Sequence, residues 1–227
     1  MACLSNLACI LEKIKEATRQ TGRLSPPELV AVSKSKSAEE IAALFLEGQK
    51  VFAENYVQEL IGKIKELEAK GLSGFEFHFI GHLQTNKVKA ILPFVSTIHS
   101  VDSLRLLQEI DSQARNFGKK ISVYFQVNID EEKSKGGFLP QDLSELSSGV
   151  QEKELIGICP LGLMAIPNPI FDVSPSFQKM QKLAKQFERT LGPGLSMGMS
   201  NDFELAIKYG ASSIRLGTIL MGARKII

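Results

Sequence analysis

A lysine closes the first apolar run of the chain, and an amine placed there could form an imine with an aldehyde. Residues 29–34 read LVAVSK, and Ser37 and Glu40 follow with the Ser-x-x-Glu spacing of a helix capping box. The run therefore predicts a strand, a brief loop and a helix start. Lys34 then lies at the carboxyl end of a buried strand, where α/β folds place ligands. A partly desolvated lysine can attack a carbonyl carbon, so Lys34 could form an imine with an aldehyde cofactor. The alternative is that Lys34 only marks where the strand reaches solvent.

Two strand-to-helix junctions late in the chain carry the residues of an anion site. A strand predicted over 195–199 is followed by Ser200, and a strand predicted over 212–217 ends in Gly217, after which Thr218 opens a short helix. Helix N-termini offer unpaired backbone N–H groups and the positive end of the helix dipole. Each junction alone also fits a plain N-cap or a tight turn. Together, after strands seven and eight of a barrel, they predict a phosphate site.

An arginine is predicted to face inward between the lysine and the phosphate site. Ile214 and Leu216 are apolar and suit the helix side of their strand, which turns Arg215 to the inside. A buried guanidinium is unfavourable unless it meets an anion or an acceptor. Lys34, the phosphate site and Arg215 together match the aldehyde, phosphate and ring nitrogen of pyridoxal 5′-phosphate. Arginine has only donors, so it would keep the ring nitrogen unprotonated and weaken the ring as an electron sink.

Further polar side chains are predicted to point into the same interior. The alternation in a strand over 121–129 turns Gln126 and Asn128 inward, and His78 faces inward from a strand over 75–81. With Lys34 they predict one ligand site at the mouth of the fold. For His78 alone, a satisfied polar group in the core is the preferred interpretation.

The elements that position these residues alternate regularly along the chain. A leading amphipathic helix carries Leu4, Leu7, Leu11, Ile14 and Thr18 at helical spacing. Eight predicted strands follow, each with a helical segment behind it, at residues 29–34, 50–54, 75–81, 97–101, 121–129, 155–166, 195–199 and 212–217. Such alternation predicts parallel strands with right-handed crossovers. We expect an α/β protein, a single (β/α)8 TIM barrel domain over residues 1–227 with an extra N-terminal helix. The alternative, an open doubly wound sheet, lacks a Gly-x-Gly-x-x-Gly after an early strand.

Composition excludes several classes of function. The net charge is +2 with acids and bases interspersed, which argues against a nucleic-acid or membrane-binding surface. The three cysteines lack metal-ligand spacing, and their odd number does not indicate a disulfide framework. No stretch resembles a membrane span or a signal peptide, so a cytoplasmic protein without a metal is predicted. Lys63 and Lys65 alternate with glutamates and predict a solvated helix face.

Six stretches of this sequence together resemble one known family. They are LVAVSKSK at 29–36, FAENYVQEL at 52–60, FHFIGHLQTNK at 77–87, GLMAIP at 162–167, LSMGMSNDFELAI at 195–207 and IRLGTILMGAR at 214–224. The chain resembles the pyridoxal phosphate homeostasis proteins, a barrel family related to the N-terminal domain of alanine racemase. The match covers almost the whole chain in the family's order. Ala53 stands where the family usually has glycine, and Asn201 where aspartate is frequent.

The resemblance implies a role for each candidate site residue. Lys34 would be the Schiff-base lysine, Asn55 would line the site and Arg215 would lie at the pyridine nitrogen. Ser200, Gly217 and Thr218 would hold the phosphate, with the backbone of Met199 nearby. Lys36 is the nearest rival for the imine but is predicted to be a solvent-facing loop lysine. Lys135 matches a family position near the mouth and could take cofactor transiently.

Two classes of function follow from the resemblance. A racemase needs a second acid/base group on the opposite face of the cofactor, which alanine racemase takes from a tyrosine of a separate domain. Tyr56, Tyr124 and Tyr209 all fall in barrel segments here. We therefore expect a non-catalytic, monomeric protein that holds pyridoxal 5′-phosphate, limits the free aldehyde and helps supply apo-enzymes. The alternatives are a racemase-like enzyme, a phosphate-ester or aldolase-type enzyme using Lys34, and a bare interaction scaffold.

Overall fold

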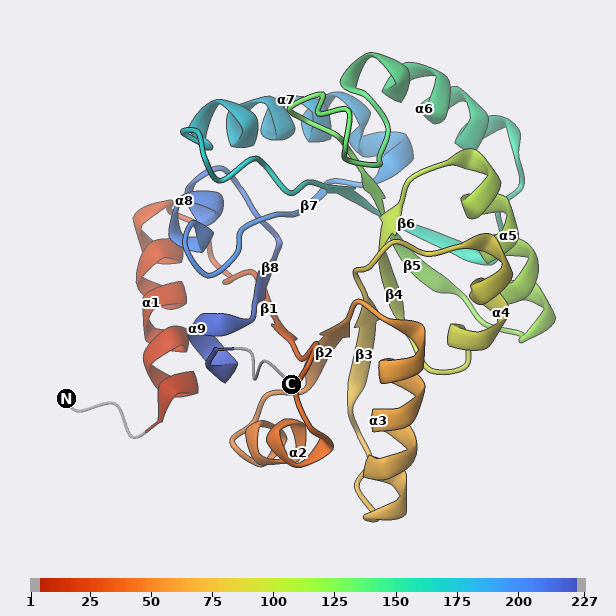
Figure 1. The fold of residues 1–227 in the computed structure, drawn as a ribbon. Coiled ribbons are helices and arrows are strands. Elements are labelled where there is room, and N and C mark those ends of the chain that lie inside the picture. The colour runs from red at the N-terminus through yellow and green to blue at the C-terminus, as the bar shows by residue number, and fades with distance from the viewer. Residues whose placement is uncertain (1–4, 224–227) are drawn as a thin grey trace.

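Eight parallel strands close into a barrel in the computed structural model, which describes residues 5–223 (Figure 1). The strands pair in chain order, and β8 closes onto β1. Their bounds are β1 Glu28–Val32, β2 Val51–Glu54, β3 Glu76–Phe79, β4 Thr97–Val101, β5 Ile121–Gln126, β6 Ile158–Met164, β7 Gly194–Ser196 and β8 Ser213–Leu216. The predicted TIM barrel is confirmed, and the open doubly wound sheet is excluded.

Helices surround the barrel and connect its strands (Figure 1). The α-helices are α1 Asn6–Gln20, α2 Ala38–Leu46, α3 Val57–Ala69, α4 Val88–Ile91, α5 Leu104–Asn116, α6 Leu143–Glu152, α7 Ser174–Leu191, α8 Phe203–Lys208 and α9 Thr218–Met221, with 3-10 turns η1 Thr85–Lys87 and η2 Pro140–Asp142. The extra N-terminal helix is therefore present as α1, which contacts α8 and α9. Leu4, assigned to this helix from the sequence, lies outside the described residues.

Local sequence signals fix several helix starts. Ser37 caps α2 in the predicted capping box, in which the Ser37 side chain accepts from the backbone of Glu40 and the Glu40 side chain accepts from the backbone of Ser37. Asp102 is also a residue type that caps helices, but Ser103 caps α5 by accepting from the backbone N–H of Leu106. Asp102 contacts His82 instead.

Strand alternation divides the barrel residues into two sets. Ile214, Leu216, Phe125 and Val127 belong to the apolar core, which includes residues of the surrounding helices, as predicted. The buried side chains of the other set fill the lumen and lie outside that core: Val30, Val32, Ala53, His78, His99, Tyr124, Met164, Ser196, Ser213 and Arg215. The lumen is therefore unusually polar for a barrel interior, which branched apolar residues normally fill.

Some predicted elements are longer than the observed ones. The strand expected to run to Met199 ends at Ser196, and α8 begins only at Phe203. The backbone N–H of Met199 donates to the carboxylate of Asp202 at 2.6 Å, which closes a turn between the two elements. The strand expected to run to Ile129 ends at Gln126, where the following loop begins.

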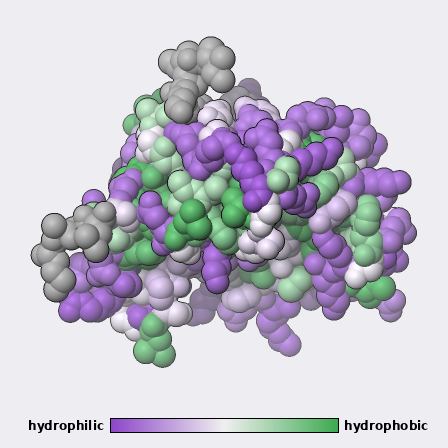
Figure 2. Space-filling model, turned by 90° about the horizontal axis from the view of Figure 1, so that it is seen from below, coloured by the Kyte–Doolittle hydropathy of each residue, from purple (hydrophilic) through white to green (hydrophobic). Residues whose placement is uncertain are grey.

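Within residues 5–223, every helix is too short or too polar to span a bilayer. On the face seen in Figure 2, hydrophilic side chains predominate, and hydrophobic ones form small patches between them.

Candidate functional site

A cavity of about 380 Å³ opens at the carboxyl ends of the barrel strands. Its walls are Val32, Lys34, Asn55, Ile80, Ile166, Pro169, Met199, Ser200, Asn201, Asp202, Arg215, Gly217 and Thr218. All seven residues proposed from the sequence as cofactor contacts therefore surround one cavity, although they come from four different strand ends. The volume is within the range typical of small-molecule sites.

Lys34 lies in a tight turn directly after β1. The carbonyl of Ser33 accepts from the backbone N–H of Lys36 at 3.0 Å, so Lys34 occupies the second position of a four-residue turn.

Lys36 is not the solvent-facing residue expected from the sequence. Its side chain is buried, and its Nζ donates to the carbonyl of Ala223 at 3.0 Å and lies 3.5 Å from Glu40. Lys36 is absent from the cavity wall, so Lys34 has no neighbouring lysine there.

Ser200, Gly217 and Thr218 form one end of the cavity. The Ser200 hydroxyl accepts from the backbone N–H of Ile219 at 3.3 Å, which leaves its own hydrogen for another acceptor. The backbone N–H groups of Ser200 and Thr218 have no hydrogen-bond partner within residues 5–223. The Met199 N–H is already bound to Asp202. Helices α8 and α9 have only six and four residues, so these local donors, more than a helix dipole, make the end suited to an anion.

Arg215 forms the floor of the cavity. Its guanidinium donates to Ser196 Oγ at 2.5 Å and to the carbonyl of Ala165 at 3.0 Å. Burial lowers the pKa of Arg215 to about 10, and the charge of Asp202 opposes that shift. Arg215 remains a cation at neutral pH, yet none of the ion pairs among the described residues includes it. A buried cation without a bound carboxylate is suited to a ligand that brings an acceptor or negative charge.

A hydrogen-bonded chain continues from Arg215 through the lumen. Ser196 Oγ lies 2.7 Å from His99 Nδ1, His99 Nε2 lies 3.0 Å from His78 Nδ1, and His78 Nε2 lies 3.2 Å from Glu76 Oε1. Arginine only donates and a carboxylate only accepts, so a chain in which the Ser196 hydroxyl accepts from Arg215 and donates to His99 would continue with a proton on Nε2 of each imidazole.

Burial and charge shift the pKa values of His99 and Glu76 in this chain. Burial, followed by the charges of His78 and Arg215, lowers the pKa of His99 well below its ordinary value. The hydrogen bond from His78 is the largest cause that lowers the pKa of Glu76, to about 2. His78 thus faces the lumen, as predicted, but it lies toward the amino ends of the strands. It is a satisfied polar group and is not part of the cavity wall.

Asn55 follows β2 and has an unsatisfied acceptor. Its side-chain Oδ1 is buried and has no partner among the described residues. The backbone of Asn55 passes very close to Gly81: a Cβ on Gly81 would lie 2.0 Å from the Asn55 carbonyl oxygen. Ala53, where the family usually has glycine, is fully buried in the lumen without displacing Asn55 from the wall. A buried orphan acceptor in a cavity wall indicates a place for a ligand donor.

The remaining predicted inward residues belong to the loop after β5. Gln126 donates to the carbonyl of Gly136, and Asn128 donates to the carbonyls of Glu132 and Lys135. They shape the loop and do not line the cavity, so their predicted convergence with Lys34 is wrong. Lys135 donates to the carbonyl of Ile166, a wall residue, which places it at the mouth of the cavity as expected.

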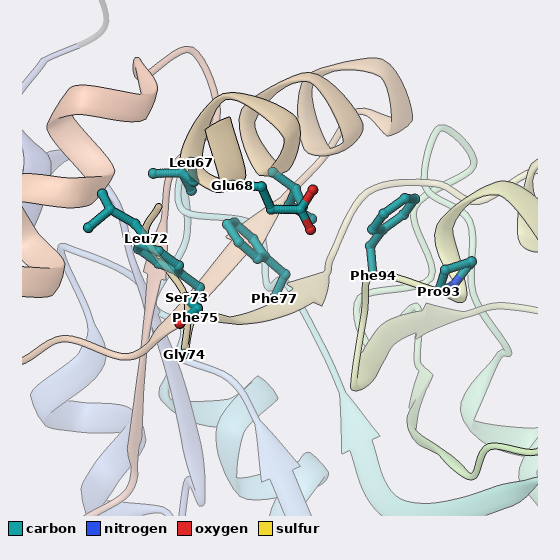
Figure 3. A pocket seen from close by; sticks show the side chains of 10 residues that line it. Leu67, Glu68, Leu72, Ser73, Gly74, Phe75, Phe77, Pro93 and Phe94 are labelled. Carbon is teal, nitrogen blue, oxygen red and sulfur yellow. The ribbon is translucent and has the colours of Figure 1, made fainter. Parts of the chain in front are cut away.

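A second pocket, of about 230 Å³, lies away from these residues. Side chains of α3, the segment entering β3 and the segment entering β4 line it, and Figure 3 shows Leu67, Phe77 and Phe94 among them. It lies at the amino end of β3 on the helix side of the barrel and contains none of the seven candidate residues. Glu68 is its sole titratable wall residue, so it offers no chemistry comparable to the cavity around Lys34.

Three further polar residues of the lumen and of the wall were not predicted from the sequence. His99 and Ser196 were not selected, although their strands show the alternation that selected Arg215: Ile98 and Met197 belong to the apolar core, and their neighbours face inward. Asp202 was also missed, and burial raises its pKa. A half-buried carboxylate that closes a short turn has no sequence signal of its own.

The fold and the cavity define a barrel protein with a small-molecule site at the carboxyl ends of its strands, containing a lysine, an arginine and an anion-binding end. The alanine racemase N-terminal domain family matches residues 6–225. The chain is 39% identical over 226 residues to the pyridoxal phosphate homeostasis protein of Escherichia coli K12, covering 96% of this chain and 95% of that protein. It belongs to the pyridoxal phosphate homeostasis protein family.

Two further relatives support this assignment. The pyridoxal phosphate homeostasis protein of Aquifex aeolicus is 40% identical over 233 residues, which cover 99% of this chain and all of that protein. The solved structure of PipY from Synechococcus elongatus with PLP bound superposes with a TM-score of 0.76 at 31% identity, covering 92% of this chain and 100% of that one.

Proposed function

We propose that this protein binds pyridoxal 5′-phosphate in the cavity around Lys34 and takes part in its homeostasis. The observation that carries the proposal is the placement of an amine, an unpaired amide oxygen, a buried guanidinium and free backbone donors around one cavity of suitable volume. The relatives' names and the PLP-bound structure of PipY support the same ligand.

Each wall residue would have a defined task. Ser200, Gly217 and Thr218 would bind the phosphate through hydroxyl and backbone donors. Arg215 would donate to the ring nitrogen, and Asn55 would accept from a ring substituent. Lys34 would add its neutral amine to the aldehyde carbon, and water would leave as the imine forms. The cofactor supplies a reactive aldehyde, and the protein supplies the geometry that holds it.

The cavity favours holding and release over racemisation. None of the three tyrosines lines it: Tyr56 is exposed, Tyr124 stacks on His99 in the lumen, and Tyr209 packs near Phe177. Besides Lys34 and Arg215, Asp202 is the titratable wall residue, and its carboxylate is bound to the Met199 backbone. A second base opposite Lys34, which racemisation needs, is therefore not provided by the described residues.

We propose release by exchange of amines. An incoming primary amine adds to the imine carbon, the bond to Lys34 breaks, and the Lys34 amine is regenerated without any oxidant or reductant. The acceptor would be an amine, including a lysine of an apo-enzyme, and the protein would act as a cytoplasmic monomer.

The test combines a cofactor-transfer assay with a racemase assay. Protein loaded with pyridoxal 5′-phosphate should reactivate an apo-enzyme and should not racemise alanine. Racemisation that is abolished in Lys34→Ala would instead establish the racemase-like alternative.

A further inference from the structure

Lys63 is buried beneath the turn that carries Lys34. Its Nζ donates to the carbonyl of Ser33 at 2.8 Å, to Glu54 Oε1 at 2.7 Å and to Glu59 Oε2 at 2.9 Å. A lysine ammonium has three N–H donors, so all of them are used. The expectation that Lys63 lies on a solvated helix face is thus wrong, whereas Lys65 is exposed. We call these four residues the Lys63 network.

The Lys63 network holds the backbone on both sides of Lys34. Lys63 binds the carbonyl of the preceding residue, Ser33, and Glu59 Oε2 accepts the backbone N–H of the following residue, Ser35, at 2.9 Å. The Ser33 hydroxyl adds a third connection by donating to Glu54 Oε1 at 2.6 Å. Lys34 is therefore fixed between two anchored neighbours; its side chain takes part in none of these hydrogen bonds, although its charge acts on Glu59.

The backbone conformation of this turn requires the hydrogen bonds of the Lys63 network. Ser35 has a φ of 61°, and it occupies the third position of the turn, where a positive φ normally selects glycine or asparagine. A non-glycine residue in the left-handed region is strained and persists only where its surroundings fix it. The contacts to Ser33 and Ser35 are the ones that fix it.

We propose that Lys63 and Glu59 are positioning residues that hold the Ser33–Lys36 turn and thereby direct the Lys34 amine at the aldehyde of the bound cofactor. This inference rests on the proposed function. Neither residue lines the cavity, so neither contacts the ligand. Their effect is on the reactive geometry of Lys34, because small displacements of a nucleophile strongly reduce the rate of bond formation.

Glu54 explains why the network is built around a lysine. Its carboxylate is fully buried, and burial raises its pKa, while the charge of Lys63 and hydrogen bonds from Lys63 and Ser33 oppose the shift. Its Oε2 has no hydrogen-bond partner among the described residues. Removing Lys63 would leave this carboxylate unpaired, which is strongly unfavourable, so a Lys63 variant tests stability as well as positioning.

Glu59 offers the cleaner test because it is partly exposed. Glu59→Ala removes the acceptor of the Ser35 N–H and keeps the contact between Lys63 and Glu54. Glu59→Gln keeps a side-chain oxygen that can accept from Ser35. Glu66→Ala is the matched control, since Glu66 is exposed on the same helix.

The first measurement needs no cofactor. Hydrogen exchange at the Ser35 amide should accelerate in Glu59→Ala and remain slow in Glu59→Gln and Glu66→Ala. The second follows imine formation with pyridoxal 5′-phosphate by absorbance. We expect Glu59→Ala to slow imine formation by roughly tenfold or more, with near wild-type rates in Glu59→Gln and Glu66→Ala.

Binding of pyridoxine 5′-phosphate, which lacks the aldehyde, separates positioning from site damage. Its dissociation constant should be unchanged in Glu59→Ala. An unchanged imine rate in Glu59→Ala, or equal losses of imine rate and of pyridoxine 5′-phosphate affinity, would overturn the inference. If the wild-type protein forms no imine at all, the proposed function fails. That result is distinct from the two outcomes that would overturn the inference about Glu59.

Lys63→Met and Lys65→Met form the second matched pair. If Lys63→Met folds, it should reproduce the slow imine formation of Glu59→Ala, while Lys65→Met should behave as wild type. If Lys63→Met does not fold, the Glu59 pair decides the question alone.

Discussion

The guanidinium of Arg215 and the hydroxyl of Ser196, 19 residues apart in the chain, form a hydrogen bond of 2.5 Å inside the barrel. The same hydroxyl lies 2.7 Å from His99 Nδ1, and a hydroxyl has one hydrogen and two acceptor lone pairs, so it can bind both groups at once. One contact at the cavity floor thus joins the cavity to the row of polar groups, His99, His78 and Glu76, that continues through the lumen.

Ser196→Ala should weaken cofactor binding. It leaves one guanidinium donor and one imidazole acceptor without a partner, and a hydrogen bond to a charged group contributes about 1.5–3 kcal/mol. We expect the dissociation constant for pyridoxal 5′-phosphate to rise roughly tenfold or more. The control is Ser213→Ala: Ser213 pairs with Ser196 across the sheet, but its buried hydroxyl has no partner among the described residues. Equal affinities in the two variants would contradict this account of Arg215.

His99 should make the fold sensitive to acid. Its pKa in the folded protein is well below the ordinary 6.5, chiefly because it is buried. Below that ordinary value the unfolded chain takes up a proton that the folded protein refuses, so the free energy of unfolding falls as the pH falls, by at most about 1.4 kcal/mol per pH unit.

Urea unfolding of His99→Gln and wild type between pH 7 and pH 5 measures this contribution. The variant should show a shallower loss of stability than wild type, while His82→Gln, which changes an exposed histidine, should keep the wild-type slope. A carboxyl group whose pKa is raised by burial, such as that of Glu54, acts in the opposite direction in both proteins. Parallel curves for His99→Gln and wild type would show that His99 titrates normally.

Ser200→Ala should discriminate between ligands with and without a phosphate. The Ser200 hydroxyl has a hydrogen available at the anion-binding end of the cavity. Its loss should weaken pyridoxal 5′-phosphate by roughly three- to tenfold, for a hydrogen bond of about 0.5–1.5 kcal/mol, and leave the weak binding of pyridoxal unchanged. Calorimetric titration with both ligands checks this, and an equal effect on both would place the phosphate elsewhere.

Gly81→Ala should damage both the fold and the site. The new Cβ would lie 2.0 Å from the Asn55 carbonyl oxygen, so the backbone of one segment must move. Overpacking of this kind destabilises by about 1–3 kcal/mol, and the displaced Asn55 should weaken cofactor binding. Gly62→Ala, in open space within α3, should instead raise the free energy of unfolding by about 0.5–1 kcal/mol. Thermal unfolding of both variants measures the difference.

Most of the architecture could be predicted because each element carries a local signal. The capping box at Ser37, the apolar runs and the alternation around Arg215 depend on nearby residues, and the structure agrees with them. Element ends were less accurate. The end of β7 depends on the turn between Met199 and Asp202, in which a side chain binds the backbone.

The residues of the candidate cavity could be predicted from the sequence, but the Lys63 network beneath the Lys34 turn was not predicted. Lys63 was assigned to solvent because it is followed by Lys65 and surrounded by glutamates. Its spacing from Leu60 and Leu67 nevertheless places it on the buried face of α3. Residue spacing cannot show that the acceptors of Lys63 are the carbonyl of Ser33 and the carboxylate of Glu54, because only the folded barrel brings these groups together.

The most direct measurement is reduction of the protein with borohydride in the presence of pyridoxal 5′-phosphate, followed by mass spectrometry to locate the modified lysine. The account predicts one adduct at Lys34, lost in Lys34→Ala and retained in Lys36→Met and Lys135→Ala. An adduct at another lysine, scattered adducts on exposed lysines, or none would contradict the proposal that the cavity holds this cofactor through Lys34.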